Sequence, residues 1–250
     1  KVLVKSLYAN AQSVQVYGGE DAATPDYGKV YISIKAKSGS NLTEVTKTSL
    51  VQSLKSFAVA SVTPVIIDPE TTFITLTTTF KYDSSLTTKD VSTLETNVVE
   101  AITGYNTDTL ENFTGMFRYS AVGKTIDDAD SSILSNITKV KMYKYITPTL
   151  SSGLKYTLSF NNAFYNPHSG HNSSAGGIVS STGFKINNDS STNEHFLDDD
   201  GAGNIRVYYL SGTTRIYTDS TFGTINYTTG EIILTSANIT SISNVDGAAS

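Results

Sequence analysis

A glycine-and-acid turn that leads into an alternating strand is the feature that most constrains what this chain can fold into. Residues 18–21 read GGED, and residues 30–35 read VYISIK. Paired glycines allow the backbone to reach positive φ or to pack closely against a neighbouring segment. In the second run every other side chain is apolar, so one face of the strand is buried. The combination predicts a tight turn feeding a half-buried strand, and it favours a structural protein over an enzyme.

Six residues of this segment are candidate site residues, expected to shape the turn and to take part in assembly. They are Gly18, Gly19, Glu20, Asp21, Tyr27 and Gly28. A GGED tetrapeptide by itself is typical of a surface turn with two solvated carboxylates. The alternating strand that follows the turn favours the more specific interpretation that these residues shape the turn and take part in assembly.

Composition narrows the class of protein. A chain of 250 residues can form two domains with a sizeable core. It has no cysteine, which excludes disulfides and thiolate-bound zinc. A net charge of −5 argues against a nucleic-acid-binding domain, which needs a basic face. The apolar runs are far shorter than the roughly 20 residues of a membrane helix, so we expect no membrane insertion.

The beginning of the chain suggests that it is part of a longer polypeptide. It starts at Lys1, and a strand-like run at residues 2–4 follows at once. We therefore expect a further N-terminal part outside this sequence, so the absence of a targeting segment says little about the intact protein.

The first half of the chain alternates helix and strand patterns. A helix is predicted after Asn41 or Thr43, either of which can cap it, with Glu44 in its first turn. Its apolar positions recur at helical spacing: Leu50, Leu54, Phe57 and Ala58. Residues 62–67 are expected to be extended, and residues 73–82 alternate as a strand buried on one face.

A second helix and a last strand complete this half. The helix is predicted to open at Thr87 or Thr88, with Gly104 where a C-cap is expected. Residues 110–134 are less regular and hold one or two short helices. The final strand is predicted at residues 139–147, where a proline stops it.

This order of elements predicts an α+β protein whose first domain, residues 1–148, has a ferredoxin-like split βαβ layout. Two helices then cover one face of an antiparallel sheet. The other face, rich in threonine, lysine and tyrosine, is either solvated or packed against a neighbouring subunit.

Residues 149–250 are predicted to form a small all-β domain. A strand is expected at residues 155–160, followed by a long Gly/Ser/Asn-rich loop to residue 177. Two hairpins are predicted, one with its turn at residues 211–212 and one with its turn at residues 228–230.

The turn and its strand resemble a signature of the baseplate wedge proteins of contractile-tailed, T4-like bacteriophages, a family with a baseplate-J-like core. In that signature a GGE turn precedes a YGKVxIxI strand. The similarity continues through Gly39, Leu42, Thr43, Asp68 and Pro69, and through the hairpin at residues 223–234. It implies that this chain is the C-terminal part of such a protein.

The resemblance also implies a function. Such a protein is a virion component that is assembled in the host cytoplasm. It associates with copies of itself, as a dimer or a ring, and with other baseplate wedge proteins. The ring surrounds the tail hub and takes part in triggering sheath contraction. A β-rich insert like residues 149–250 touches neighbouring wedge components. No cofactor and no catalytic residue are implied.

Two groups of residues resemble metal sites. His168 and His171, with His195 or an aspartate from residues 198–200, have metal-ligand side chains, but imidazoles in a Gly/Ser loop are usually solvated. Residues 198–209 partly follow a calcium-loop pattern, yet Ala202 and Tyr209 stand where affinity requires oxygen ligands. We therefore predict that neither group binds a metal and that the chain has no cofactor. The aspartates at residues 198–200 are predicted to lie in a turn that leads into the next strand.

Catalysis and glycan binding are the remaining alternatives. No GxSxG motif marks a nucleophile, and nothing places two carboxylates across a cleft, so we predict that the chain is not an enzyme. An abundance of Ser, Thr and Asn with a β-rich C-terminal half is also typical of an adhesin or a carbohydrate-binding surface protein. That alternative stays open, although secreted domains of this kind often carry disulfides and this chain has none.

Overall fold

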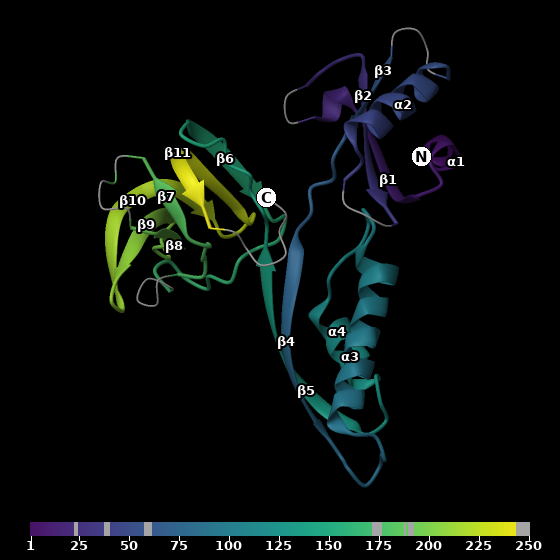
Figure 1. Ribbon diagram of the computed structural model, residues 1–250, viewed down its shortest axis with the longest axis vertical. Coiled ribbons are helices and arrows are strands. Elements are labelled where there is room, and N and C mark those ends of the chain that lie inside the picture. Colours follow the sequence, from purple (N-terminus) through teal and green to yellow (C-terminus); the bar gives the residue numbers. More distant parts are fainter. Residues whose placement is uncertain are drawn as a thin grey trace. The chain divides into compact units, whose positions relative to one another are not determined.

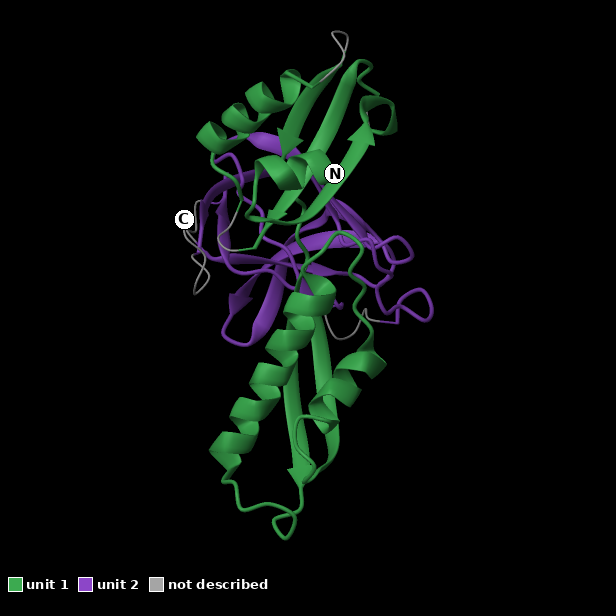
Figure 2. Cartoon of the chain, turned by 90° about the vertical axis from the view of Figure 1, so that its right-hand side faces the viewer, with its two compact units in different colours: residues 1–141 green, residues 142–250 purple. Residues whose placement is uncertain are grey.

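The computed structural model shows two compact units, residues 1–141 and 142–250 (Figure 2). The described residues are 1–22, 25–37, 41–57, 62–171, 177–187, 189 and 193–243. Gly39 and Ala58, which entered the sequence predictions, lie outside them. The fold is mixed α+β, with more strands than helices along the described chain. None of the helices found there is long and apolar enough to cross a membrane.

The first unit begins with a three-stranded sheet and two helices (Figure 1). In chain order they are α1 (Val2–Leu7), β1 (Ala11–Gly18), β2 (Lys29–Ala36), α2 (Glu44–Lys55) and β3 (Thr63–Ile67). β2 lies in the middle, antiparallel to β1 and parallel to β3. The predicted strand after the turn, the first helix and the extended segment are thus confirmed.

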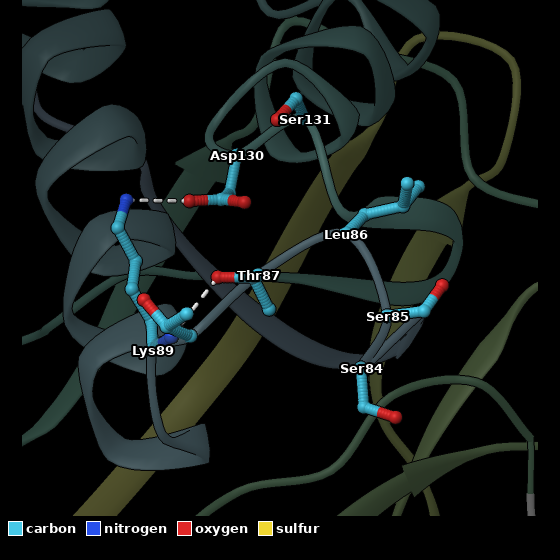
Figure 3. A pocket seen from close by; sticks show the side chains of 8 residues that line it. Ser84, Ser85, Leu86, Thr87, Lys89, Asp130 and Ser131 are labelled. Atoms are coloured by element: carbon cyan, nitrogen blue, oxygen red, sulfur yellow. Dashed lines mark hydrogen bonds and ion pairs between the residues drawn. The ribbon is translucent and has the colours of Figure 1, made fainter.

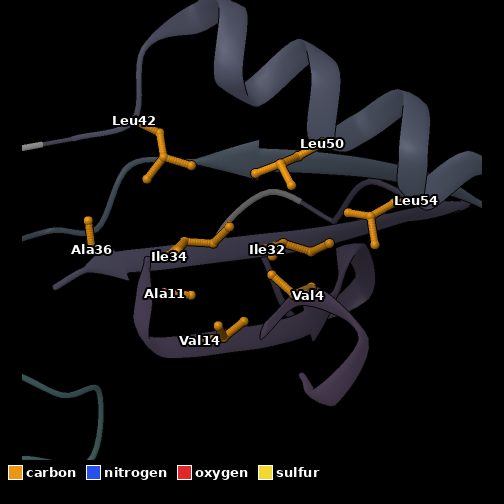
Figure 4. Close-up of a cluster of buried hydrophobic side chains, with 9 residues drawn as sticks. All are labelled: Val4, Ala11, Val14, Ile32, Ile34, Ala36, Leu42, Leu50 and Leu54. Atoms are coloured by element: carbon orange, nitrogen blue, oxygen red, sulfur yellow. The ribbon is translucent and has the colours of Figure 1, made fainter. Parts of the chain in front are cut away.

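Apolar side chains from both helices, from two strands and from the segment just before α2 form the core of this part (Figure 4). They are Val4, Ala11, Val14, Ile32, Ile34, Ala36, Leu42, Leu50 and Leu54. The alternation of β2 puts Ile32 and Ile34 into this core. The Thr43 side chain caps α2 by accepting a 3.3 Å hydrogen bond from the Thr46 amide.

Two expectations for this part are wrong. The run at residues 2–4 is helical, because α1 buries Val4 against the sheet and this packing overrides the strand preference of valine. Phe57 follows the end of α2 and is 64% exposed, so it does not contribute to the core.

The rest of the first unit is a two-stranded ribbon with helices along one face (Figure 1). Its elements are β4 (Phe73–Tyr82), α3 (Val91–Tyr105), the π-helical turn η2 (Asn106–Leu110), α4 (Tyr119–Asp127) and β5 (Ile133–Tyr143). The side chains of Leu76 and Phe80 pack against a cluster that contains Val98, Val122 and Ile126. The Gln12 amide donates to the Thr107 carbonyl at 3.2 Å, which joins β1 to η2.

The ferredoxin-like split βαβ layout is not confirmed. The described strands of this unit form two separate sheets, β1-β2-β3 and β4-β5, each with its own hydrophobic cluster. The sequence shows which face of each strand is apolar, but it does not show which strands pair. β5 also begins earlier than the predicted strand at residues 139–147, because Ile133 joins the helix-covered core.

Gly104 does not cap α3, contrary to expectation. The helix runs through it to Tyr105 and continues into the π-helical turn, with Asn106 in right-handed α conformation at its end. Asp90 accepts from the Thr93 amide at 2.8 Å and caps the other end, so α3 starts at Val91.

The second unit contains a small β-barrel. Its strands are β6 (Gly153–Ser159), β7 (Phe184–Ile186), β8 (His195–Asp199), β9 (Asn204–Ser211), β10 (Thr214–Asn226) and β11 (Glu231–Ile242). The strand order is β10-β9-β8-β7-β11-β6, and a further β10–β11 pairing closes the sheet. The strand predicted at residues 155–160 and both hairpins are confirmed. The boundary between the compact units falls within β5, a few residues before the predicted boundary at residues 148 and 149.

Candidate functional site

The turn between β1 and β2 is held together by close backbone contact at Gly19. A short 3₁₀ turn spans Gly19–Asp21, and the Gly19 carbonyl accepts hydrogen bonds from the Ala22 amide at 3.2 Å and the Asp26 amide at 2.9 Å. An ideal Cβ on Gly19 would lie 2.9 Å from the Asp26 carbonyl carbon and closer still to its oxygen. Glycine is therefore required here by lack of space.

Gly18 and Gly28 have different roles from Gly19. Gly18 is extended, with φ −71°, and the atoms nearest to a Cβ there would be those of the flexible Glu20 carboxylate. Gly28 has φ +79°, in the left-handed region that favours glycine. Of the two possibilities that the sequence offered for Gly18 and Gly19, close packing is found at Gly19, whereas positive φ is found at Gly28.

The far side of the turn is fixed by a small polar network that sequence reasoning missed. Lys29 Nζ lies 2.6 Å from Asp26 Oδ2, and the Tyr31 hydroxyl donates to the same oxygen at 3.2 Å. The hydrogen bond from Lys29 holds the pKa of Asp26 below its usual range. The Tyr31 ring stacks on Tyr17 of β1 with centroids 5.5 Å apart. The i, i+3 spacing of Asp26 and Lys29 was the only available signal.

Three candidate residues project from this braced turn. Tyr27 is 80% exposed, and Glu20 and Asp21 are also exposed. Among the described residues, none of these three side chains makes a hydrogen bond or an ion pair. The arrangement offers one exposed aromatic ring and two exposed carboxylates. Such a group suits binding to another macromolecule more than it suits chemistry.

The two loop histidines lie together, but they do not form a complete metal site. His171 Nδ1 is 3.1 Å from His168 Nε2, and His168 Nδ1 is 3.2 Å from the Ser169 carbonyl oxygen. A neutral pair satisfies this pattern with ring N–H groups alone. His195 is fully buried in β8, with Nε2 3.2 Å from Asp189. The described residues contain no group of three metal-ligating side chains.

Asp198 is buried in a charge network and not exposed in a turn. It is 1% exposed and belongs to β8. Its oxygens accept from Arg206 Nε at 2.9 Å, Arg215 Nη1 at 2.7 Å and the Tyr217 hydroxyl at 2.8 Å. The Arg206 guanidinium also lies over the Tyr217 ring, 4.3 Å from its centroid. The network ties β8, β9 and β10 together and leaves no vacant carboxylate for calcium.

Asp199, next to it, is fully buried and holds the barrel to the segment that precedes β7. Oδ1 accepts from the amides of Ile178 at 2.6 Å and Val179 at 2.8 Å. Oδ2 accepts from the Tyr227 hydroxyl at 2.6 Å and from the Gly201 amide at 3.3 Å. The predicted turn exists at residues 200–203, but these two aspartates precede it and have structural roles.

We therefore expect the histidine loop and the aspartate turn to bind no stoichiometric metal. Elemental analysis of protein purified without chelator tests this. The expectation fails if a metal is present and is lost on substitution of His168 and His171. It also fails if calcium raises the Tm and Asp200→Ala abolishes the rise.

A hollow of about 500 Å³ lies beside the start of α3 (Figure 3). Its lining is mainly hydroxyl side chains: Ser84, Ser85, Leu86, Thr87, Thr88, Lys89, Asp130 and Ser131. Lys89 Nζ lies 2.6 Å from Asp130 Oδ2, and this hydrogen bond holds the pKa of Asp130 below its usual range. The cation and the carboxylate compensate each other, so the hollow has no charge left to select a ligand.

Comparisons with known proteins agree on one family. Residues 1–67 match "Baseplate structural protein gp6, C-terminal domain I", and residues 70–145 match "Baseplate structural protein gp6, C-terminal domain III". The chain is also 31% identical over 150 residues to the baseplate wedge protein gp6 of Enterobacteria phage T4. The match covers 58% of this chain and 22% of that relative.

Proposed function

Because the chain belongs to the gp6 family of baseplate wedge proteins, as a C-terminal part, we propose that it is a structural component of a phage tail baseplate. It assembles with copies of itself and with other wedge proteins into a ring around the tail hub. Rearrangement of that ring takes part in triggering sheath contraction. The two matched domain families follow each other along residues 1–145, which supports the assignment for most of the first unit.

The observation that carries the proposal is the braced turn with its exposed side chains. Gly19 packs against the Asp26 backbone, while Tyr27 stays 80% exposed. A tyrosine side chain has few rotatable bonds and so loses little conformational freedom on binding, and tyrosine is common among residues that dominate interfaces. We propose Gly18, Gly19, Glu20, Asp21, Tyr27 and Gly28 as an assembly motif, in which the glycines shape the turn and the other three make the contacts.

The role is structural and not catalytic. Both matched families are described as baseplate structural proteins. The buried carboxylates of Asp198 and Asp199 are engaged by arginines, tyrosines and backbone amides, which makes them parts of the fold.

We expect Tyr27→Ala in the full-length protein to reduce incorporation into tails without unfolding the chain. Loss of an interface tyrosine of this kind costs about 2 kcal/mol, or roughly 30-fold in affinity. Glu20→Gln should have a smaller effect in the same direction, since an exposed ion pair contributes less than about 1 kcal/mol. Quantitative mass spectrometry of purified tails is the readout, and thermal unfolding of the isolated chain checks the fold.

Tyr165→Ala is the matched control, because Tyr165 is 72% exposed in the second unit and lies outside the motif. Equal loss for Tyr27→Ala and Tyr165→Ala would show that the turn has no special role. Specific binding of glycans by the isolated chain, together with its absence from purified tails, would favour a carbohydrate-binding surface protein instead.

A further inference from the structure

The ribbon of β4 and β5 has one face covered by helices and one that is not. Leu76 and Phe80 of β4 point to the helices, where they join the cluster around Val122 and Ile126. The hydroxyl oxygens of Thr78 and Thr138 lie 3.1 Å apart, so Thr138 of β5 is on that same covered side. The alternating neighbours of these residues must then be on the opposite side.

That opposite side, called here the ribbon face, is cationic and partly apolar. It consists of Thr77, Thr79, Lys81, Ile137, Lys139 and Lys141. All six are exposed, and Ile137 is exposed to 69%. Within the described part of the chain, none of the three lysines makes an ion pair. The ribbon face therefore carries three ammonium groups and one exposed isoleucine, in a chain whose net charge is −5.

We propose that the ribbon face binds the assembly motif of a second copy of this chain. In this contact Glu20 and Asp21 of one copy lie against Lys139 and Lys141 of the other copy. The Tyr27 ring of the first copy lies against Ile137 of the second. This inference rests on the proposed function and names the two surfaces that meet. The two groups are complementary in charge, and each also offers one apolar side chain.

A second copy of this chain is the partner we propose for the ribbon face, because the chain itself carries a surface of complementary charge. The motif has two exposed carboxylates without a partner among the described residues, and the ribbon face has three such ammonium groups. Neither the carboxylates of the motif nor the ammonium groups of the ribbon face form an ion pair with a described residue of the first unit. Because motif and ribbon face are different surfaces, the contact either repeats from copy to copy or is made twice within a symmetric dimer.

The test is sedimentation velocity of the chain at concentrations up to roughly 100 µM, where weak association is still populated. We expect the wild-type chain to self-associate, and more weakly as salt rises, because exposed charges are screened. Lys139→Glu with Lys141→Glu should weaken association by at least about tenfold, and so should Glu20→Lys with Asp21→Lys. All four substitutions together should restore association to within about threefold of wild type, because the positive and negative charges have then exchanged places and attract each other again.

Lys5→Glu with Lys55→Glu is the control, since it makes the same change in net charge at exposed positions of α1 and α2. It should leave association unchanged. A monomeric wild-type chain, loss of association in the control, or failure of the exchanged variant to recover would each overturn the proposed pairing. If association persists in all variants and the chain is found in tails, the pairing is wrong and the baseplate function stands. If the chain is absent from tails, the function itself fails.

Discussion

Asp199→Ala is expected to destabilise the second unit by about 3 to 5 kcal/mol, because it leaves buried hydrogen-bond donors without an acceptor. The Asp199 side chain is fully buried and accepts bonds from three backbone amides and the Tyr227 hydroxyl. Urea unfolding of the chain measures the loss as a lower free energy of unfolding.

Asp219→Ala is the matched control. Asp219 is in β10, and its carboxylate accepts from the Thr221 amide at 2.8 Å in an exposed setting. Its loss should change the free energy of unfolding by less than about 1 kcal/mol. Similar effects of the two substitutions would contradict the structural role assigned to Asp199.

The contact between Tyr227 and Asp199 also makes the stability of the second unit depend on pH. Burial raises the pKa of Tyr227, and the hydrogen bond to Asp199 raises it further. The folded protein thus favours the neutral phenol. The stabilisation is fully present below the usual tyrosine pKa of about 10 and declines as pH rises above it toward the folded value. Tyr227→Phe should make this alkaline decline smaller without abolishing it, because the raised pKa values of Tyr31 and Tyr217 contribute in the same direction. Free energies of unfolding measured across that pH range test this.

Gly19→Val is expected to destabilise the first unit by at least about 2 to 3 kcal/mol and to block incorporation into tails. A Cβ at this position overlaps the Asp26 backbone carbonyl, which cannot rotate away as a side chain can. The Asp26 amide also donates to the Gly19 carbonyl, so moving the two segments apart breaks a 2.9 Å hydrogen bond.

Gly18→Ala separates this effect from a general intolerance of the turn. Gly18 has an ordinary extended conformation, and the nearest atoms to its new methyl group would be at the flexible end of the Glu20 side chain, which can move aside. We expect a change within about 0.5 kcal/mol, measured by thermal unfolding. If Gly19→Val folds and assembles as well as Gly18→Ala, the turn is only a permissive surface loop.

Local features of the fold could be predicted from the sequence because they depend on neighbouring residues. Alternation identified β2 and β4, and the Thr43 cap with helical spacing identified α2. The same rules failed for α1, where contact with the sheet outweighs the strand preference of Val2 and Val4. Gly104 resembled a C-cap, yet η2 continues the chain in helical form beyond it.

Long-range pairing could not be predicted in the same way. Nothing in residues 63–82 shows that β3 joins β2 while β4, among the described strands, pairs with β5 alone. The candidate turn was identified from its glycines, but the Asp26 carbonyl that makes Gly19 necessary comes from the far side of the loop. Asp199 was predicted to be part of a turn leading into the next strand, because its burial by residues 178, 179 and 227 depends on the closed barrel.

A reconstruction of the intact tail, with this chain located in its density, tests the central claim most directly. The account predicts both units within the baseplate, in repeated copies around the hub, with the turn at residues 18–28 in a contact between chains. Finding the chain only in the sheath, the tube or a distal fibre, or finding it nowhere in the particle, would contradict the account.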